Sequence, residues 1–198
     1  MNLLHLDSSI LGQNSASREL SAALVARLRA QTPGLQVTYR DLAAATPKHL
    51  DGGSLAKADA GEAALGEELL QEFLGADLIV VGVPMYNFNI PSQLKAWIDR
   101  VAVAGRSFRY TAQGPEGLAK AQRVIVAGAY GGAHPAGGPS NFIEPYLRFM
   151  FGFLGIGDVQ FVTAEGLAIS PEQRAQALAA AHARIDAGEL DVGLPLAA

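Results

Sequence analysis

The chain has 198 residues, of which 49% are hydrophobic and 17% charged, and it carries a formal net charge of −4. This apolar content excludes a disordered chain, and the charge argues against broad electrostatic binding to nucleic acid or to anionic membranes. The sequence has no cysteine, which excludes disulfides, iron–sulfur ligation and thiolate nucleophiles. The longest strongly apolar stretch, residues 78–83, is far shorter than the roughly 20 residues that cross a bilayer. No secretory signal pattern opens the chain, so we expect one cytoplasmic domain over residues 1–198.

Short apolar runs alternate with amphipathic segments along the chain, and this alternation predicts strands and helices in turn. Strands are expected at residues 2–7, 35–39, 77–83, 123–129 and 159–163. Helices are expected at about residues 15–29, 60–74, 90–101 and 142–154, with a last helix that begins at Ser170. Asn89 is a candidate N-cap for the third helix, with Pro91 in its first turn. Residues 106–111 have the pattern of one half of a small hairpin.

This alternation of strands and helices predicts an α/β fold, with a parallel sheet covered by helices on both faces. Five repeated units favour a flavodoxin-like, doubly wound, five-stranded parallel sheet over the six-stranded dinucleotide-binding fold. In such sheets ligands bind beyond the carboxyl ends of the strands. We therefore expect a ligand at three loops, residues 7–17, 84–89 and 129–140.

The first loop offers hydroxyl groups between the end of a strand and the start of a helix. These hydroxyls belong to Ser8, Ser9, Ser15 and Ser17. Together with free backbone N–H groups and the helix dipole, they suit one phosphate group. No Lys or Arg lies between Met1 and Ala16, so hydrogen bonds and the dipole would hold the anion. The alternative is that these serines only cap the helix and fill a turn.

The second loop places a thioether, two aromatic rings and an amide directly after a buried strand, in Met85, Tyr86, Asn87 and Phe88. A flat heteroaromatic ring needs apolar contacts on its faces and hydrogen bonds at its edge, and the Asn87 amide can donate and accept. The alternative is that Met85 and Phe88 are core residues beside an ordinary turn.

The third loop contains two adjacent glycines, Gly131 and Gly132, where the backbone can approach a ligand closely. His134 follows them and is a candidate for ligand contact. Adjacent glycines are also common turn residues, and a histidine in a loop can simply be solvated. Phosphate chemistry in one loop and ring chemistry in another nevertheless describe a mononucleotide with a flat ring, which is FMN.

These segments resemble the bacterial FMN-dependent NADH:quinone oxidoreductase and azoreductase family. The resemblance rests on residues 4–9, 15–20, 84–91, 108–111, 114–118 and 152–155, and it extends from the N-terminus to about residue 166. It implies a flavodoxin-like homodimer with one FMN per subunit and active sites at the subunit interface.

The resemblance also implies roles for individual positions. The phosphate would be held by Ser9, Ser15, Ala16 and Ser17, and the isoalloxazine would be lined by Met85, Tyr86, Asn87 and Phe88. Its pyrimidine side would be closed by Ala129, Tyr130, Gly131 and Gly132. The family frequently has Ser-Arg where this chain has Ala129-Tyr130, so backbone contacts alone are expected there. Substrate would contact Tyr110, Phe161 and His134, with Tyr110 reaching from the partner subunit.

The function implied is oxidation of NADH or NADPH coupled to reduction of quinones and to cleavage of aromatic azo compounds into amines. The implied cycle is ping-pong: hydride enters the flavin, NAD(P)⁺ leaves, and an acceptor then takes two electrons. No side chain stands out as an obligatory acid, base or metal ligand, and Asn87 at the ring edge is the candidate for assisting charge build-up. The alternative function is that of a flavodoxin-type electron carrier without its own substrate.

The expected helix at residues 142–154 is apolar almost all round, since Glu144 and Arg148 are its only charged positions. A helix on one face of a small α/β domain should have one apolar stripe and one solvated face. Residues 142–154 therefore predict that a second copy of the chain covers the outer face, in an obligate homodimer. The alternative is a helix unusually deep within its own domain.

Overall fold

A computed structural model describes residues 1–190 of the chain, so residues 191–198 of the expected domain lie outside the described part. Its centre is a parallel sheet of five strands in the order β2-β1-β3-β6-β7. These strands are β1 (Asn2–Asp7), β2 (Gln36–Asp41), β3 (Leu78–Pro84), β6 (Arg123–Ala129) and β7 (Val159–Ala164). The order places β1 between β2 and β3, with the chain winding outward in both directions. The flavodoxin-like fold class and the five predicted strands are confirmed.

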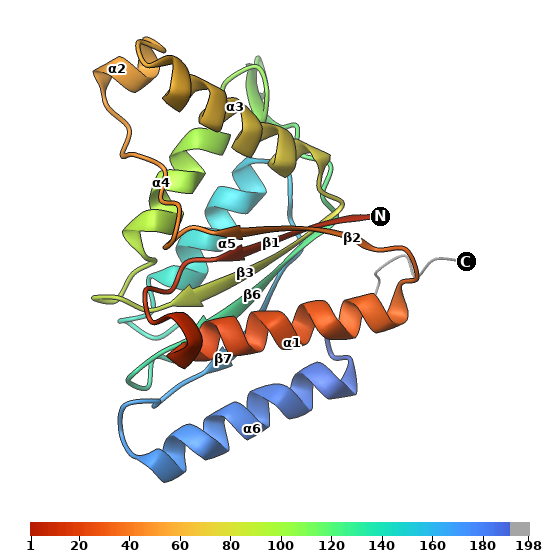
Figure 1. The fold of residues 1–198 in the computed structure, drawn as a ribbon, viewed down its shortest axis with the longest axis vertical. Helices are drawn as coiled ribbons and strands as arrows, with labels where there is room; N and C mark the ends of the chain where they lie inside the picture. Colours follow the sequence, from red (N-terminus) through yellow and green to blue (C-terminus); the bar gives the residue numbers. More distant parts are fainter. Residues whose placement is uncertain (191–198) are drawn as a thin grey trace.

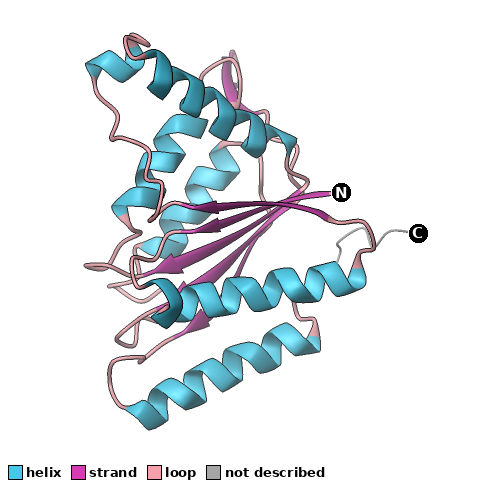
Figure 2. Cartoon of the chain, viewed as in Figure 1, coloured by secondary structure: helices cyan, strands magenta, loops and turns pink. Residues whose placement is uncertain are grey.

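Helices cover the two faces of this sheet (Figures 1 and 2). One face carries α1 (Ala16–Gln31) and α6 (Pro171–Ala187), and the other carries α3 (Ala60–Gly75), α4 (Ser92–Val101) and α5 (Ile143–Phe153). Every residue of β3 and β6 is buried, which explains why their sequences, apart from Arg123 at the start of β6, are apolar without alternation. No helix in the described part of the chain combines the length and apolar content that a membrane span requires.

Three short elements complete the structure. A 3₁₀ turn, η1 (Gly12–Asn14), precedes α1, and a four-residue helix, α2 (Gly52–Leu55), precedes α3. An antiparallel hairpin forms from β4 (Phe108–Thr111) and β5 (Gly114–Gly117), and it projects from the body of the protein (Figure 2). The hairpin confirms the extended segment predicted at residues 106–111.

Two helices begin at serine residues whose side chains cap the first turn. Ser15 accepts a hydrogen bond from the Arg18 N–H at 3.3 Å, and Ser170 accepts one from the Gln173 N–H at 3.1 Å. The predicted cap at Asn89 is wrong, because the N-cap residue of α4 is Pro91, two residues later, and it makes no side-chain cap. The Asn89 side chain instead accepts from the N–H of the next residue, and its backbone pairs with Tyr86 in a tight turn.

Helix α5 buries one stripe, Ile143, Leu147 and Phe151, against the sheet. Its outer side remains apolar, since Phe149 is 70% exposed and Phe142, the residue before the helix, is 54% exposed. A helix deep inside its own domain would bury both rings, so that alternative is wrong. Within residues 1–190, these two rings on the outer side of α5 are left exposed.

Candidate functional site

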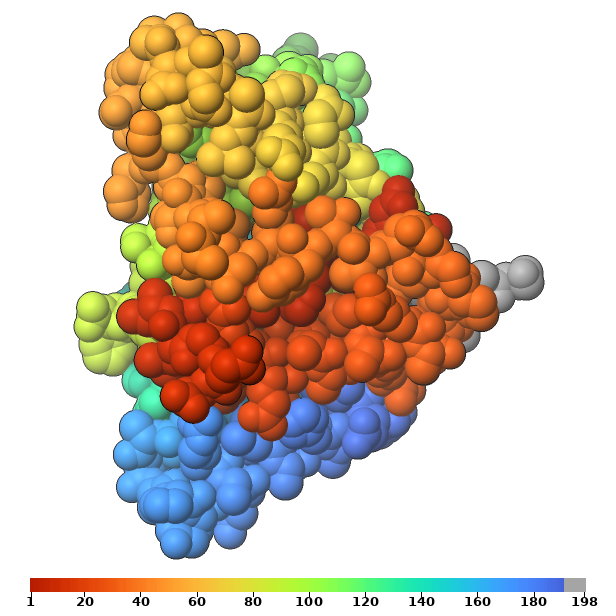
Figure 3. Space-filling view, in the orientation of Figure 1, coloured from red at the N-terminus to blue at the C-terminus, as the bar shows by residue number. Residues whose placement is uncertain are grey.

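The three loops expected to bind a ligand meet at the carboxyl ends of β1, β3 and β6, where they reach the surface side by side (Figure 3). In the first loop, Ser9, Ser15 and Ser17 are all buried. The hydroxyl oxygens of Ser15 and Ser17 lie 3.1 Å apart at the start of α1. Buried hydroxyls at the start of a sixteen-residue helix have the chemistry that a phosphate group needs.

Sequence reasoning missed Arg18, which lies in the first turn of α1. Its guanidinium donates to both carboxylate oxygens of Asp41 at 2.7 Å and to the Ser9 carbonyl from Nε at 3.2 Å and Nη2 at 2.7 Å. It also donates to the Tyr39 hydroxyl, which in turn donates to buried Asp7. Arg18 and Asp41 are 23 residues apart, and only the pairing of β1 with β2 brings them together, so no local pattern announces the contact.

These charges shift one another's proton affinity. The hydrogen bonds from Arg18 lower the pKa of the Asp41 carboxyl below its usual value, and Asp41 raises the pKa of Arg18. Burial and the neighbouring Asp7 carboxylate raise the pKa of Tyr39 to about 12. At neutral pH, therefore, the ion pair is charged and the Tyr39 hydroxyl is a neutral donor.

The second loop is a tight turn in an uncommon conformation. Tyr86 and Asn89 exchange backbone hydrogen bonds at 3.0 and 3.1 Å, and the two residues between them, Asn87 and Phe88, have φ of +48° and +68°. Asn87 tolerates this left-handed backbone, whereas for a bulky residue such as Phe88 it is strained. Both side chains are exposed, and within the described residues the Asn87 amide makes no hydrogen bond. A strained turn with a free amide and an exposed ring is typical of a ligand site.

The first two loops are joined through Tyr86. Its hydroxyl accepts a hydrogen bond from the Ile10 N–H at 3.2 Å and lies 3.4 Å from the Ser9 hydroxyl. The Met85 N–H donates to the carbonyl of Ala129 at 3.0 Å and so ties the second loop to the third. Backbone and side-chain bonds therefore hold the three loops in one arrangement.

The third loop presents backbone rather than side chains. The Tyr130 ring is only 1% exposed and lies in the core on the α5 side of the sheet. Burial raises the pKa of its phenol to about 12. The carbonyls of Gly131 and Gly132 accept from the N–H groups of Ala168 and Gly166 at 2.9 Å, which fixes the loop against the turn after β7. The buried ring is consistent with the expectation that only backbone can meet a ligand at Tyr130.

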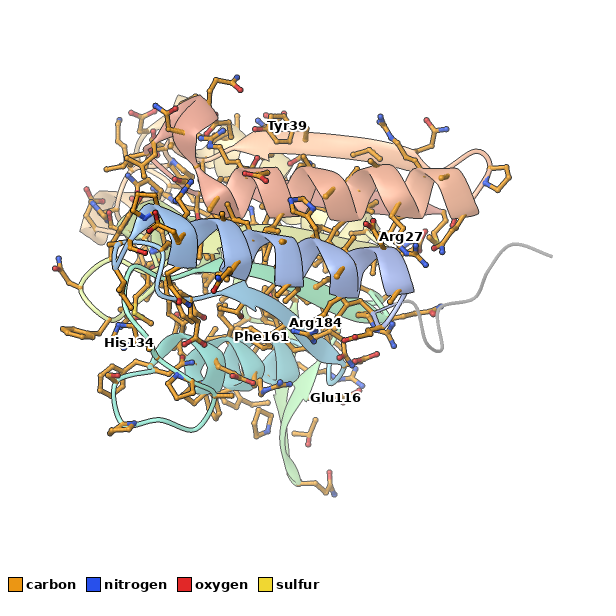
Figure 4. All side chains as sticks on the ribbon, turned by 90° about the horizontal axis from the view of Figure 1, so that it is seen from below. Arg27, Tyr39, Glu116, His134, Phe161 and Arg184 are labelled. Carbon is orange, nitrogen blue, oxygen red and sulfur yellow. The ribbon has the colours of Figure 1, made fainter. Side chains whose placement is uncertain are left out.

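His134 is more constrained than a solvated loop histidine. Its Nδ1 lies 2.7 Å from the Ser140 hydroxyl, and its backbone N–H donates to Glu165 at 2.7 Å. Its ring stands edge-to-face with Phe88, with centroids 5.6 Å apart. His134 thus joins the second and third loops at the carboxyl end of the sheet (Figure 4).

The structure does not bring Tyr110 and Phe161 to these loops within one chain. Phe161 lies along the sheet beside α5 (Figure 4), with the Arg148 guanidinium 4.8 Å above its ring. Tyr110 is 75% exposed on the projecting hairpin, and its ring packs on Phe108.

A cavity of about 620 Å³ lies beside the first loop. It is lined by polar residues of the Arg18 network and by Ser15, and it contains no residue of the second or third loop. Asn89, at the end of the second loop, lines a separate cavity of about 300 Å³ together with His49 and Tyr146.

A family model described as a flavodoxin-like fold matches residues 1–188. Curated relatives match over nearly the whole chain. An FMN-dependent NADH:quinone oxidoreductase of Stenotrophomonas maltophilia (strain K279a) is 56% identical over 190 residues, which cover 96% of this chain and 97% of the relative. A protein of the same name from Xanthomonas oryzae pv. oryzae (strain KACC10331 / KXO85) is 60% identical over 188 residues, covering 94% of this chain and 96% of the relative.

Solved structures of azoreductases superpose on this chain over nearly its whole length. An azoreductase from Bacillus anthracis str. Sterne superposes with a TM-score of 0.82 at 25% identity, covering 93% of this chain and 96% of that one. An FMN-dependent NADH-azoreductase from Bacillus anthracis str. Ames Ancestor, solved in complex with FMN, superposes with a TM-score of 0.87 at 23% identity. That match covers 98% of this chain and 100% of the other, and it supports the fold.

Proposed function

This chain belongs to the flavodoxin-like family that includes the FMN-dependent NADH:quinone oxidoreductases, and we propose that it reduces quinones and aromatic azo compounds with electrons from NADH. The observation that carries the proposal is the junction of the three loops. Buried hydroxyls at the start of α1 lie beside a turn with exposed aromatic and amide groups, and Tyr86 joins the two. One phosphate group and one flat ring fit this arrangement.

The residues present fit FMN at both ends. Ser9, Ser15 and Ser17 with the N–H groups of the first turn of α1, including that of Ala16, would hold the phosphate. Met85, Tyr86 and Phe88 would contact the ring, and the free Asn87 amide would hydrogen-bond its polar edge. Backbone groups of residues 129–132 would close the pyrimidine side.

Bound FMN supplies the two-electron chemistry, and the chain supplies orientation, stacking surfaces and hydrogen bonds. NADH and the acceptor would occupy the same open face in turn, which makes the order of events ping-pong. The Asn87 amide would stabilise, by hydrogen bonding, the negative charge that develops at the edge of the ring during transfer. Cleavage of an azo bond to two amines takes two such rounds, because each round delivers two electrons.

A homodimer with active sites at the interface is part of the proposal. The exposed rings of Phe142 and Phe149 support it, since an apolar helix face of this kind is typical of an obligate interface. Tyr110 on the projecting hairpin and Phe161 beside α5 would then reach the partner's flavin or its substrate. His134, in edge-to-face contact with Phe88, would meet the substrate from the same subunit.

The proposal also treats residues 1–198 as one flavodoxin-like domain and places the protein in the cytoplasm, where NADH is available. Support for one domain is that every described strand except the β4–β5 hairpin joins a single sheet.

The test is purification without added cofactor, followed by acid release of the bound flavin and a steady-state assay. We expect a yellow protein, release of FMN rather than FAD, and continuous NADH oxidation when a quinone is present. The single phosphate position at the start of α1 is the reason for the preference over FAD. Released FAD would contradict the cofactor assignment, and bound FMN without NADH oxidation would indicate an electron carrier instead.

A further inference from the structure

We propose that Arg18 is a positioning residue for the phosphate end of the flavin site, and that it acts through the Ser9–Ile10 peptide without touching the phosphate. The inference rests on the proposed FMN function. It concerns how this chain holds its first loop, and the contacts of one guanidinium carry it.

All five N–H donors of Arg18 are already used. Nε donates to the Ser9 carbonyl, Nη1 to Tyr39 and Asp41, and Nη2 to the Ser9 carbonyl and Asp41. A planar guanidinium has no further donor to offer. Although Arg18 is the cation next to the phosphate loop in sequence, all of its donors are taken by groups of the protein, including the Asp41 carboxylate, and none is left for a bound phosphate.

The acceptors of Arg18 are themselves fixed. Asp41 Oδ1 also accepts from the N–H groups of Ala43 and Ala44, at 3.0 and 3.1 Å, so the carboxylate cannot easily rotate. The Tyr39 hydroxyl donates to Asp7, whose side chain is almost fully buried. The end of β2 therefore holds the guanidinium in one orientation above the end of β1.

The fixed Arg18 guanidinium holds a single peptide unit, the one between Ser9 and Ile10. The Ser9 carbonyl accepts twice from Arg18, and the N–H of the same peptide, that of Ile10, donates to the Tyr86 hydroxyl. No described peptide is cis, so this C=O and N–H point in opposite directions. Holding the carbonyl toward β2 thus turns the N–H toward the ring-side turn, and it sets the spacing between the phosphate end and the ring end of the site.

A comparison of FMN with riboflavin tests the role, because riboflavin lacks only the phosphate. Apoprotein is titrated with each flavin, and binding is followed by fluorescence quenching, for wild type, Arg18→Met and Arg18→Lys. For Arg18→Met we expect FMN affinity to fall about tenfold or more while riboflavin affinity changes less than about threefold. The FMN affinity of Arg18→Lys should fall nearly as far, because an ammonium group keeps the charge but cannot form the paired hydrogen bonds of a guanidinium. Arg29→Met, an exposed position near the end of the same helix, is the control and should change neither affinity.

Each outcome decides between this role and another. Equal losses for FMN and riboflavin would indicate general damage to the site and would overturn the proposal. Wild-type FMN affinity in Arg18→Lys would mean that charge alone matters and would overturn it as well. If Arg18→Met does not fold, Arg18→Lys carries the test. A wild-type apoprotein that binds neither flavin would instead refute the proposed function itself.

Discussion

The phosphate end and the ring end of the site are built in opposite ways. At the phosphate end, buried hydroxyls and a guanidinium are hydrogen-bonded within one chain. At the ring end, Asn87 and Phe88 are exposed on a strained turn, and away from it the rings of Tyr110 on the hairpin and Phe149 on α5 are exposed as well. In the proposed site, the groups at the phosphate end therefore already have partners within the chain, whereas Asn87 and Phe88 at the ring end are exposed.

Physical chemistry accounts for the difference. A buried polar group left without a partner costs about 1–3 kcal/mol, so a polar site must be organised before its ligand arrives. The faces of a flat ring need only area to contact, at roughly 25 cal/mol per Å² removed from water, and several surfaces can supply that area. Changes at the ring end should therefore alter assembly and stacking, and changes at the phosphate end should alter recognition of one group.

The largest effect is expected at the outer face of α5. Phe149→Asp places a charge where we propose that two subunits meet, and burying an unpaired charge is costly. The dissociation constant of the dimer should rise at least about a hundredfold, and NADH–quinone activity should fall with it. Analytical ultracentrifugation at low micromolar concentration measures the dissociation constant of the dimer, and a steady-state assay measures the NADH–quinone activity.

The matched control is Ala180→Asp, which adds the same charge to an exposed position of α6 on the opposite face of the sheet. It should leave both the sedimenting mass and the NADH–quinone activity unchanged. A Phe149→Asp protein that sediments as a dimer with full activity would show that this face is not the interface.

The second effect comes from the Tyr130 phenol, whose pKa is raised to about 12 by burial. A raised pKa means that the native state favours the neutral phenol, so its contribution is complete below pH 10 and is lost as pH rises from 10 toward 12. Wild type should lose roughly 2–3 kcal/mol of unfolding free energy in this window through Tyr130. Denaturant unfolding at stepped pH measures the loss.

Tyr130→Phe should flatten that part of the pH dependence, although it also removes the hydrogen bond with Thr163. Thr163→Val removes the same hydrogen bond but keeps the phenol, so it should lower stability at neutral pH while retaining the alkaline loss. Equal alkaline slopes for wild type and Tyr130→Phe would argue against the proposed cause.

A somewhat smaller effect is expected at Asn87. Asn87→Gly preserves the left-handed backbone and removes only the amide, whereas Asn87→Leu also adds backbone strain. Loss of the edge hydrogen bond should cost about 1–3 kcal/mol, or roughly ten- to hundredfold in FMN affinity or in turnover. Flavin titration and NADH turnover of Asn87→Gly are the measurements. Unchanged values for both would rule out the contact.

The contrast also explains what could be predicted from sequence. Apolar runs such as that in β3 and the hydroxyl cap at Ser15 are local patterns, so the sheet, the helices and the three loops were accessible. The Arg18–Asp41 pair depends on two strands meeting, and no spacing rule contains it. Asn89 was a plausible cap by residue type, but the turn at Tyr86 consumes its backbone groups. Left-handed backbone at Phe88 runs against residue preference, as expected where function opposes local propensity.

The smallest effect is expected at Phe88, where the glycine variant should be more stable than the alanine variant, the reverse of the usual order. This comparison tests whether the turn at residues 86–89 is strained. Phe88→Ala and Phe88→Gly both remove the ring and its contact with His134, so in the folded state they differ in how well each residue accepts a φ of +68°. Glycine adopts this conformation freely, while a Cβ raises its energy by roughly 1–2 kcal/mol. The larger unfolded-state entropy of glycine offsets part of that gain, so apo Phe88→Gly should be more stable than apo Phe88→Ala by about 0.5–1 kcal/mol. Leu55, 73% exposed in helix α2, gives the matched pair, where glycine should instead be the less stable of the two. Urea unfolding of the four variants measures both differences, and an alanine protein more stable than the glycine protein at position 88 would mean that the turn stores no strain.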